Sequence, residues 1–145
     1  MPYVTIAGDE LHYIAHEQDA DCTLVGIHGA GQDARIWPSA LGQIDGINCY
    51  LLDLPGHGQS GGTARESIAA YADVVIGFVE SRKPRKVILL GHCMGGAIAQ
   101  QIALENPDWL QALILVSTGC RIRSTPGYLA TLRDDYPQAV EQTIA

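Results

Sequence analysis

The sequence has few basic residues. Nine lysines and arginines stand against sixteen aspartates and glutamates, which gives a formal net charge of -7. The basic residues form no stripe, so the composition argues against nucleic acid or an anionic membrane as a partner. Their only concentration is in residues 82–86, where we expect a solvated turn with cations at the C-terminal end of a helix.

Long apolar runs and cysteine pairs are also missing. The N-terminal residues have neither a basic segment nor a long apolar one, so we expect no signal peptide, no membrane span and a cytoplasmic location. The four cysteines include no CxxC pair and no metal-ligand spacing, so we expect free thiols, no metal and no cofactor. Three of them, Cys22, Cys49 and Cys120, flank or enter strand-like runs and are expected to pack as small apolar side chains.

What is present is a well-patterned chain of 145 residues that is 47% hydrophobic and 17% charged, as in a single globular domain. Short apolar runs alternate with segments of helical spacing, which predicts an α/β fold with a mostly parallel sheet and helices on both faces. The expected strands are residues 3–6 and 11–15, forming a hairpin, then 23–27, 47–52, 87–90 and 112–116. The expected helices are residues 33–41, 67–81 and 95–106, followed by a helical tail after residue 126.

The central stretch is KVILLGHCMGGA, residues 86–97. A buried strand is followed abruptly by small residues and then by helical spacing, which predicts a sharp turn with Cys93 at its corner. Glycine is expected on both flanks, at Gly91 and Gly95, because a Cβ atom there would collide with the facing strand or helix. Such a turn exposes one side chain at the C-terminal edge of the sheet.

This stretch resembles the nucleophile elbow of the α/β-hydrolases, usually G-x-S-x-G, with cysteine in place of serine. Two further segments resemble the family in the right order, namely HGAG at residues 28–31 and DLPGHGQS at residues 53–60. The resemblance implies that Cys93 is the nucleophile and that the backbone amides of Ala30 and Met94 form the oxyanion hole. It also makes His28 and Gly29 loop-shaping residues, and it makes the 53–60 loop, with His57, a brace for the sheet edge.

Two more histidines, His12 and His16, fall on the expected hairpin and are predicted to be polar residues on its surface. The triad of this family runs nucleophile, acid, histidine, yet no histidine follows His92 in this sequence. Asp134 and Asp135 lie in the helical tail, which makes neither a credible triad acid. The resemblance therefore covers residues 1–120 as an incomplete core through a sixth strand, with residues 121–145 as the start of a helical cap or lid.

The sixth strand is expected to form an exposed apolar edge. Either the chain is a piece of a longer protein, or a second chain or another copy completes the sheet. The leading functional hypothesis is hydrolysis of a small-molecule ester or thioester, with the remaining triad members outside this chain. The alternatives are acyl transfer through a thioester intermediate, and a non-catalytic ligand-binding module of the same fold.

Overall fold

The computed structural model describes residues 2–120, 127–135 and 137–138. Its strands are β1 (Tyr3–Ile6), β2 (Asp9–His16), β3 (Cys22–Ile27), β4 (Ile47–Leu52), β5 (Lys86–His92) and β6 (Leu110–Val116). Its helices are α1 (Ile68–Arg82), α2 (Met94–Leu104) and α3 (Tyr128–Asp134), with two short 3-10 helices, η1 (Ala34–Ile36) and η2 (Ser39–Gln43).

In the described part of the chain the strands form a six-stranded sheet in the order β1-β2-β4-β3-β5-β6. β1 pairs with β2, and β2 with β4, in antiparallel fashion, whereas β4, β3, β5 and β6 run parallel to their neighbours. The sequence prediction of an α/β fold with a mostly parallel sheet is confirmed. The carboxyl ends of β3, β4 and β5 consequently meet at one edge, where the loops that follow them converge.

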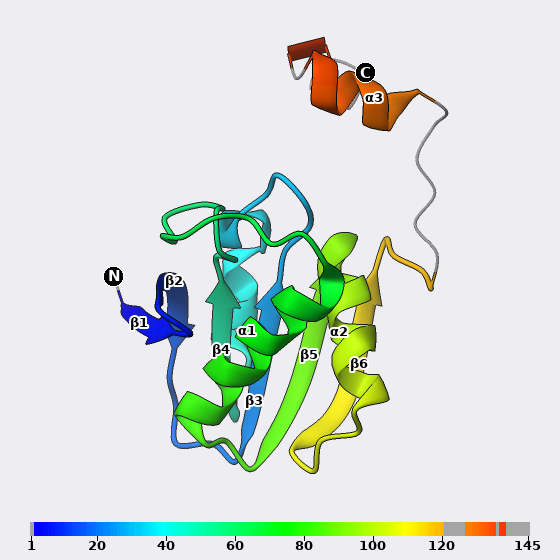
Figure 1. Cartoon of the computed structure of the whole chain (residues 1–145). Coiled ribbons are helices and arrows are strands. Elements are labelled where there is room, and N and C mark those ends of the chain that lie inside the picture. Colours follow the sequence, from blue (N-terminus) through cyan, green and yellow to red (C-terminus); the bar gives the residue numbers. More distant parts are fainter. Residues whose placement is uncertain (1, 121–126, 136, 139–145) are drawn as a thin grey trace.

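Helical segments cover both faces of this sheet, and α1 and α2 lie side by side on one of them (Figure 1). The larger apolar core lies beneath these two helices and includes Phe78, Ile98 and Ile102, none of them exposed. A smaller core on the opposite face includes Leu24 and Leu51, with side chains of the η1–η2 segment packed against it.

The segment 33–41 was predicted to be a covering helix, and this prediction was wrong. Two 3-10 helices occupy the segment, separated by Trp37 and Pro38 in extended conformation, with ψ angles of 135° and 139°. A proline disfavours helical geometry in the residue before it, so Pro38 divides what the apolar spacing alone suggested was one helix.

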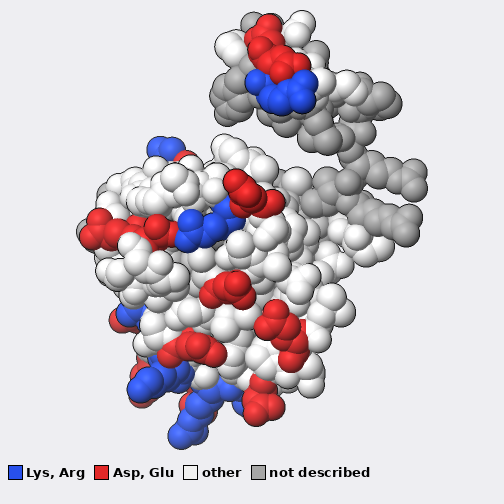
Figure 2. Space-filling model, viewed as in Figure 1, with Lys and Arg blue, Asp and Glu red and all other residues white. Residues whose placement is uncertain are grey.

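The α1 helix confirms its prediction to within one residue. Ser67 caps its start by accepting a hydrogen bond from the Ala70 amide, and Lys83 ends it in left-handed conformation, with its amide donating to the Val79 carbonyl. The predicted cations at its C-terminal end are also confirmed, since Arg82 lies in the last turn. Figure 2 shows basic side chains gathered at this end of the molecule, with acidic side chains spread over the face covered by α1 and α2.

The β6 strand lies at one edge of the sheet, as predicted, and several of its apolar side chains are exposed. Ile114 is 45% exposed and Leu115 is 44% exposed. Neighbouring residues of a strand point to opposite faces, so apolar side chains are exposed on both faces near the end of β6, although Leu110 and Leu113 pack against the larger core. Leu104, at the end of α2, is 81% exposed as well.

The helical tail predicted after residue 126 is present as α3 in the described residues. Figure 1 shows α3 apart from the sheet. The rest of the predicted lid, at residues 121–126, 136 and 139–145, lies outside the described residues. The division into a core and the start of a lid stays a prediction.

Candidate active site

Cys93 occupies the corner between β5 and α2 with φ 49° and ψ -113°. A positive φ is uncommon for a residue with a side chain, and backbone of this kind costs on the order of 1–3 kcal/mol unless its surroundings hold it. The strained strand-to-helix turn expected from the sequence is therefore present, and the thiol side chain is half-buried.

Hydrogen bonds on both sides of Cys93 hold this strained backbone. Its amide donates to the Val116 carbonyl at 3.1 Å, and its carbonyl accepts from Thr118 Oγ1 at 2.7 Å and from the Gly96 amide at 3.1 Å. The elbow is thus tied to the end of β6 and to the first turn of α2. Thr118 was not identified as a site residue from the sequence, and its contact with the Cys93 carbonyl spans 25 residues.

The glycines of the elbow allow close backbone approach. A Cβ atom on Gly91 would lie 2.5 Å from the Gly95 carbonyl oxygen, and one on Gly95 would run into the carbonyl oxygens of Ile27 and His28 at the end of β3. Atoms do not approach that closely, so larger residues would separate β5 from α2 or α2 from β3. The close packing of α2 on these strands depends on both glycines.

The HGAG loop at the end of β3 lies directly against the elbow. A Cβ atom on Gly29 would lie 3.1 Å from Cys93 Cβ and 3.2 Å from His92 Nδ1. The structure therefore brings together the two segments that the sequence singled out, although they lie about 60 residues apart in the chain.

His28 shapes this loop from a completely buried position. Its Nδ1–H donates to the Gly29 carbonyl at 2.7 Å, and its Nε2 accepts from the Leu54 amide at 3.0 Å. Burial is the main reason that the pKa of His28 lies below its ordinary value. With both ring nitrogens engaged and the ring neutral, His28 has no free nitrogen for taking a proton from Cys93.

The backbone amides of Ala30, in the HGAG loop, and of Met94, directly after Cys93, belong to the two segments that meet at the elbow. Among the described residues, neither amide donates a hydrogen bond. Ala30 is exposed and Met94 is half-buried. The site therefore has two backbone donors without acceptors, one from the loop after β3 and one from the start of α2.

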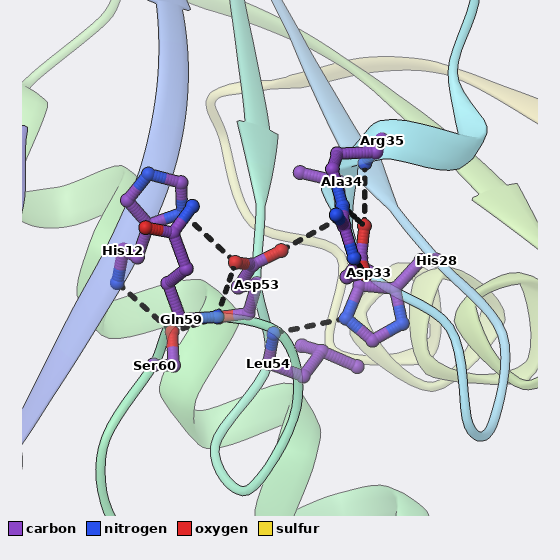
Figure 3. Close-up of polar contacts among 9 residues, drawn as sticks. All are labelled: His12, His28, Asp33, Ala34, Arg35, Asp53, Leu54, Gln59 and Ser60. Atoms are coloured by element: carbon purple, nitrogen blue, oxygen red, sulfur yellow. Dashed lines mark hydrogen bonds and ion pairs between the residues drawn. The ribbon is translucent and has the colours of Figure 1, made fainter. Parts of the chain in front are cut away.

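Behind the site, Asp53 joins several segments (Figure 3). Its carboxylate accepts from His12 Nδ1 at 2.8 Å, from the Ala34 amide at 2.7 Å and from the Gln59 amide at 2.8 Å. Ser60 Oγ donates to the Asp53 carbonyl at 2.6 Å and accepts from the His12 amide at 2.9 Å. These contacts link β2, β4, η1 and the 53–60 loop, so the loop braces the sheet edge.

The prediction that His12 is a polar surface residue was wrong, because its side chain is buried. β2 lies between β1 and β4, so a side chain on this strand can face the interior, and the buried carboxylate of Asp53 supplies the partner that makes burial possible. His16 is exposed, as predicted. His57 packs its ring 5.1 Å from that of His28 and 6.2 Å from that of Tyr71, a structural position.

The packing prediction for the other cysteines holds in part. Cys49 is buried and Cys22 is half-buried, but Cys120 is exposed. Among those residues, no three His, Cys, Asp or Glu side chains cluster closely enough to hold a metal ion. No helix there has the length and apolar character that crossing a bilayer requires.

Comparison with known proteins supports the resemblance seen in the sequence. The model of the alpha/beta hydrolase family matches residues 24–144, most of the chain. The chain belongs to this family. It is 32% identical over 139 residues to a pimeloyl-[acyl-carrier protein] methyl ester esterase of Klebsiella pneumoniae, a match that covers 88% of this chain and 52% of the relative.

Solved structures of the family have the same fold. A thermophilic esterase is 31% identical with a TM-score of 0.75, and the match covers 97% of this chain and 53% of the esterase. An AqdC variant that cleaves the ring of the Pseudomonas quinolone signal has a TM-score of 0.85 at 15% identity, over 99% of this chain and 56% of its own. The α/β-hydrolase chain described here thus spans about half the length of its curated relatives.

Proposed function

We propose that Cys93 is the nucleophile of an ester or thioester hydrolase whose oxyanion hole is formed by the amides of Ala30 and Met94. The observation that carries this proposal is the juxtaposition at the elbow. A strained corner presents a thiol where the loop that carries the Ala30 amide meets the elbow that carries the Met94 amide, and among the described residues neither amide has an acceptor. Two converging donors next to a nucleophile are what acyl transfer requires.

The proposed chemistry follows from the charges that develop. The Cys93 thiolate attacks the acyl carbonyl carbon, and the carbonyl oxygen becomes an oxyanion that accepts from both amides. The start of α2 adds the positive end of its dipole at the same place. Collapse of the intermediate expels the alcohol or thiol with a proton and leaves a thioester on Cys93. Water then attacks this thioester, which releases the acid and restores the thiol.

The proton transfers require a general base. We place this histidine and its acid outside the present chain, since no histidine follows Cys93 in the sequence. The exposed apolar residues at the end of β6, Ile114, Leu115 and Val116, support this placement, because additional elements of a longer polypeptide or of a second chain would bury them. From the family resemblance alone, we also propose that residues 121–145 begin a lid over the substrate.

For the substrate we propose a small carboxylic ester or thioester. The relative from Klebsiella is named for a methyl ester, and the solved relative with 31% identity is named an esterase. A thioester intermediate is itself an acyl donor. The alternative reaction is therefore acyl transfer, in which an alcohol or amine, instead of water, attacks the thioester on Cys93.

The test uses the full polypeptide that carries this sequence, with p-nitrophenyl butyrate as substrate. Cys93→Ala is expected to lower kcat by at least about 10³-fold, as loss of a nucleophile does in related chemistry. Cys22→Ala, the matched control at a half-buried thiol away from the elbow, is expected to retain wild-type kinetics. Equal activity of the Cys93→Ala and wild-type proteins would contradict the proposal. Saturable binding of the ester without turnover would favour the non-catalytic module.

A further inference from the structure

The Gln32 side chain lies between the two halves of the proposed site. Its Oε1 accepts from the Gly29 amide at 2.9 Å and from His92 Nδ1 at 2.9 Å. Gly29 belongs to the HGAG loop, and His92 is the residue directly before Cys93. One oxygen atom therefore joins the loop that carries one free amide to the elbow that carries the nucleophile and the other free amide.

The orientation of the Ala30 amide depends on the peptide that joins Gly29 to Ala30. The Gly29 carbonyl accepts from His28 Nδ1 at 2.7 Å and from the Gln32 amide at 3.2 Å. A trans peptide is planar, so the carbonyl and the following N–H point in opposite directions. Fixing the Gly29 carbonyl toward His28 and Gln32 therefore also fixes the direction of the Ala30 N–H.

The chain is fixed on the other side of Gly29 as well. Its own amide is engaged by Gln32 Oε1, so both peptide units around Gly29 are held by hydrogen bonds. His28 supplies one of these contacts, but it belongs to the loop itself and lies at the end of β3. Among the hydrogen bonds of the described residues, the one between Gln32 and His92 joins the oriented loop to the elbow.

We propose that Gln32 and His92 form a positioning latch that sets the Ala30 amide at its working distance from Cys93. This inference rests on the proposed function. Neither residue touches the reacting atoms; the latch acts through the backbone of Gly29 and Ala30. Its contribution to catalysis is to keep the two oxyanion donors, which come from different loops, converging on one point.

The chain offers a set of variants that separates this role from simple support of the fold. Gln32→Met keeps the length of the side chain but removes the acceptor. His92→Leu removes the donor from the other side, and His92→Asn restores an N–H donor close to the position of Nδ1. The Gln32→Met, His92→Leu double variant lacks both partners of the bond between Gln32 and His92.

Two reactions of the full polypeptide measure the effect. Hydrolysis of p-nitrophenyl butyrate develops an oxyanion, whereas alkylation of Cys93 by iodoacetamide displaces iodide from a saturated carbon and develops none. Gln32→Met and His92→Leu are expected to lower kcat about 10- to 100-fold with KM unchanged, since displacement of an oxyanion donor acts on the transition state. Their alkylation rates at Cys93 should stay within about twofold of wild type. His92→Asn should recover most of kcat, and the double variant should be no slower than the worse single variant.

The possible failures differ from one another. A kcat of Gln32→Met equal to that of wild type would overturn the latch while leaving the proposed function intact. A parallel fall in esterase and alkylation rates, without rescue by His92→Asn, would also overturn it and indicate a general role in folding. A wild-type protein that is alkylated at Cys93 but never hydrolyses the ester would refute the proposed function, and the latch with it.

Discussion

Replacing Asp53 with alanine is expected to destabilise the protein strongly, because two buried donors and the partly buried Gln59 amide lose their common acceptor. His12 Nδ1, the Ala34 amide and the Gln59 amide all lie within 2.8 Å of the carboxylate. A hydrogen bond to a charged group contributes about 1.5–3 kcal/mol, and a buried donor left unpaired costs a similar amount. Because the contributions are not additive and water can enter the space, we expect a loss of about 3–5 kcal/mol in the free energy of unfolding.

Urea unfolding followed by tryptophan fluorescence measures this loss, and Asp21→Ala is the matched control. Asp21 is 74% exposed and lies 3.7 Å from an exposed arginine, Arg85, so its removal should change the free energy of unfolding by less than about 0.5 kcal/mol. A loss below about 1 kcal/mol for Asp53→Ala, with the urea dependence unchanged, would refute the reasoning that this carboxylate holds the sheet edge and its loops together.

Three other predictions follow from the site and its surroundings. Burial lowers the pKa of His28 from its ordinary 6.5, so the unfolded chain binds this proton at higher pH than the folded one does. The free energy of unfolding should therefore fall as pH drops below about 6.5, and this pH dependence should be weaker in His28→Asn. Gly95→Ala should lower both the free energy of unfolding and the rate of Cys93 alkylation, because the added Cβ would collide with the Ile27 carbonyl. Gly61→Ala is the control and should be nearly neutral in both measurements, because its Cβ would lie 3.5 Å from the nearest atom, the Glu10 carbonyl oxygen. Burial raises the pKa of Cys49 to about 11, so iodoacetamide at pH 8 should label the exposed Cys120 well before Cys49. Peptide mass spectrometry of the labelled native protein measures this, and equal labelling of the two cysteines would contradict the buried placement of Cys49.

Much of the fold was predictable because its signals are local. The strand at residues 47–52 matches β4 residue for residue, and the helix after Ser67 follows from its cap and apolar spacing. The prediction of one helix at residues 33–41 was wrong for a local reason. Pro38 disfavours helical geometry at Trp37, and apolar spacing does not reveal this effect. The prediction for His12 was wrong for a non-local reason, because the burial of His12 depends on Asp53, which lies 41 residues further along the chain.

The candidate site was predictable only as far as its motifs reach. The elbow around Cys93 and the HGAG loop each carry a local signature of small residues, and the structure places them in contact. The contacts of Gln32 with His92 and of Thr118 with the Cys93 carbonyl span 60 and 25 residues. Neither side chain belongs to a motif, so a single sequence gave no signal that it would reach the elbow.

The most direct test of the central claim is the intact mass of the full polypeptide after brief mixing with p-nitrophenyl butyrate and quenching in acid. If Cys93 is the nucleophile, the protein gains the mass of one butyryl group, hydroxylamine removes it, and peptide mapping assigns it to the peptide that contains Cys93. Steady ester turnover with no adduct on wild type, and equal turnover by Cys93→Ala, would contradict the assignment of Cys93 as the nucleophile.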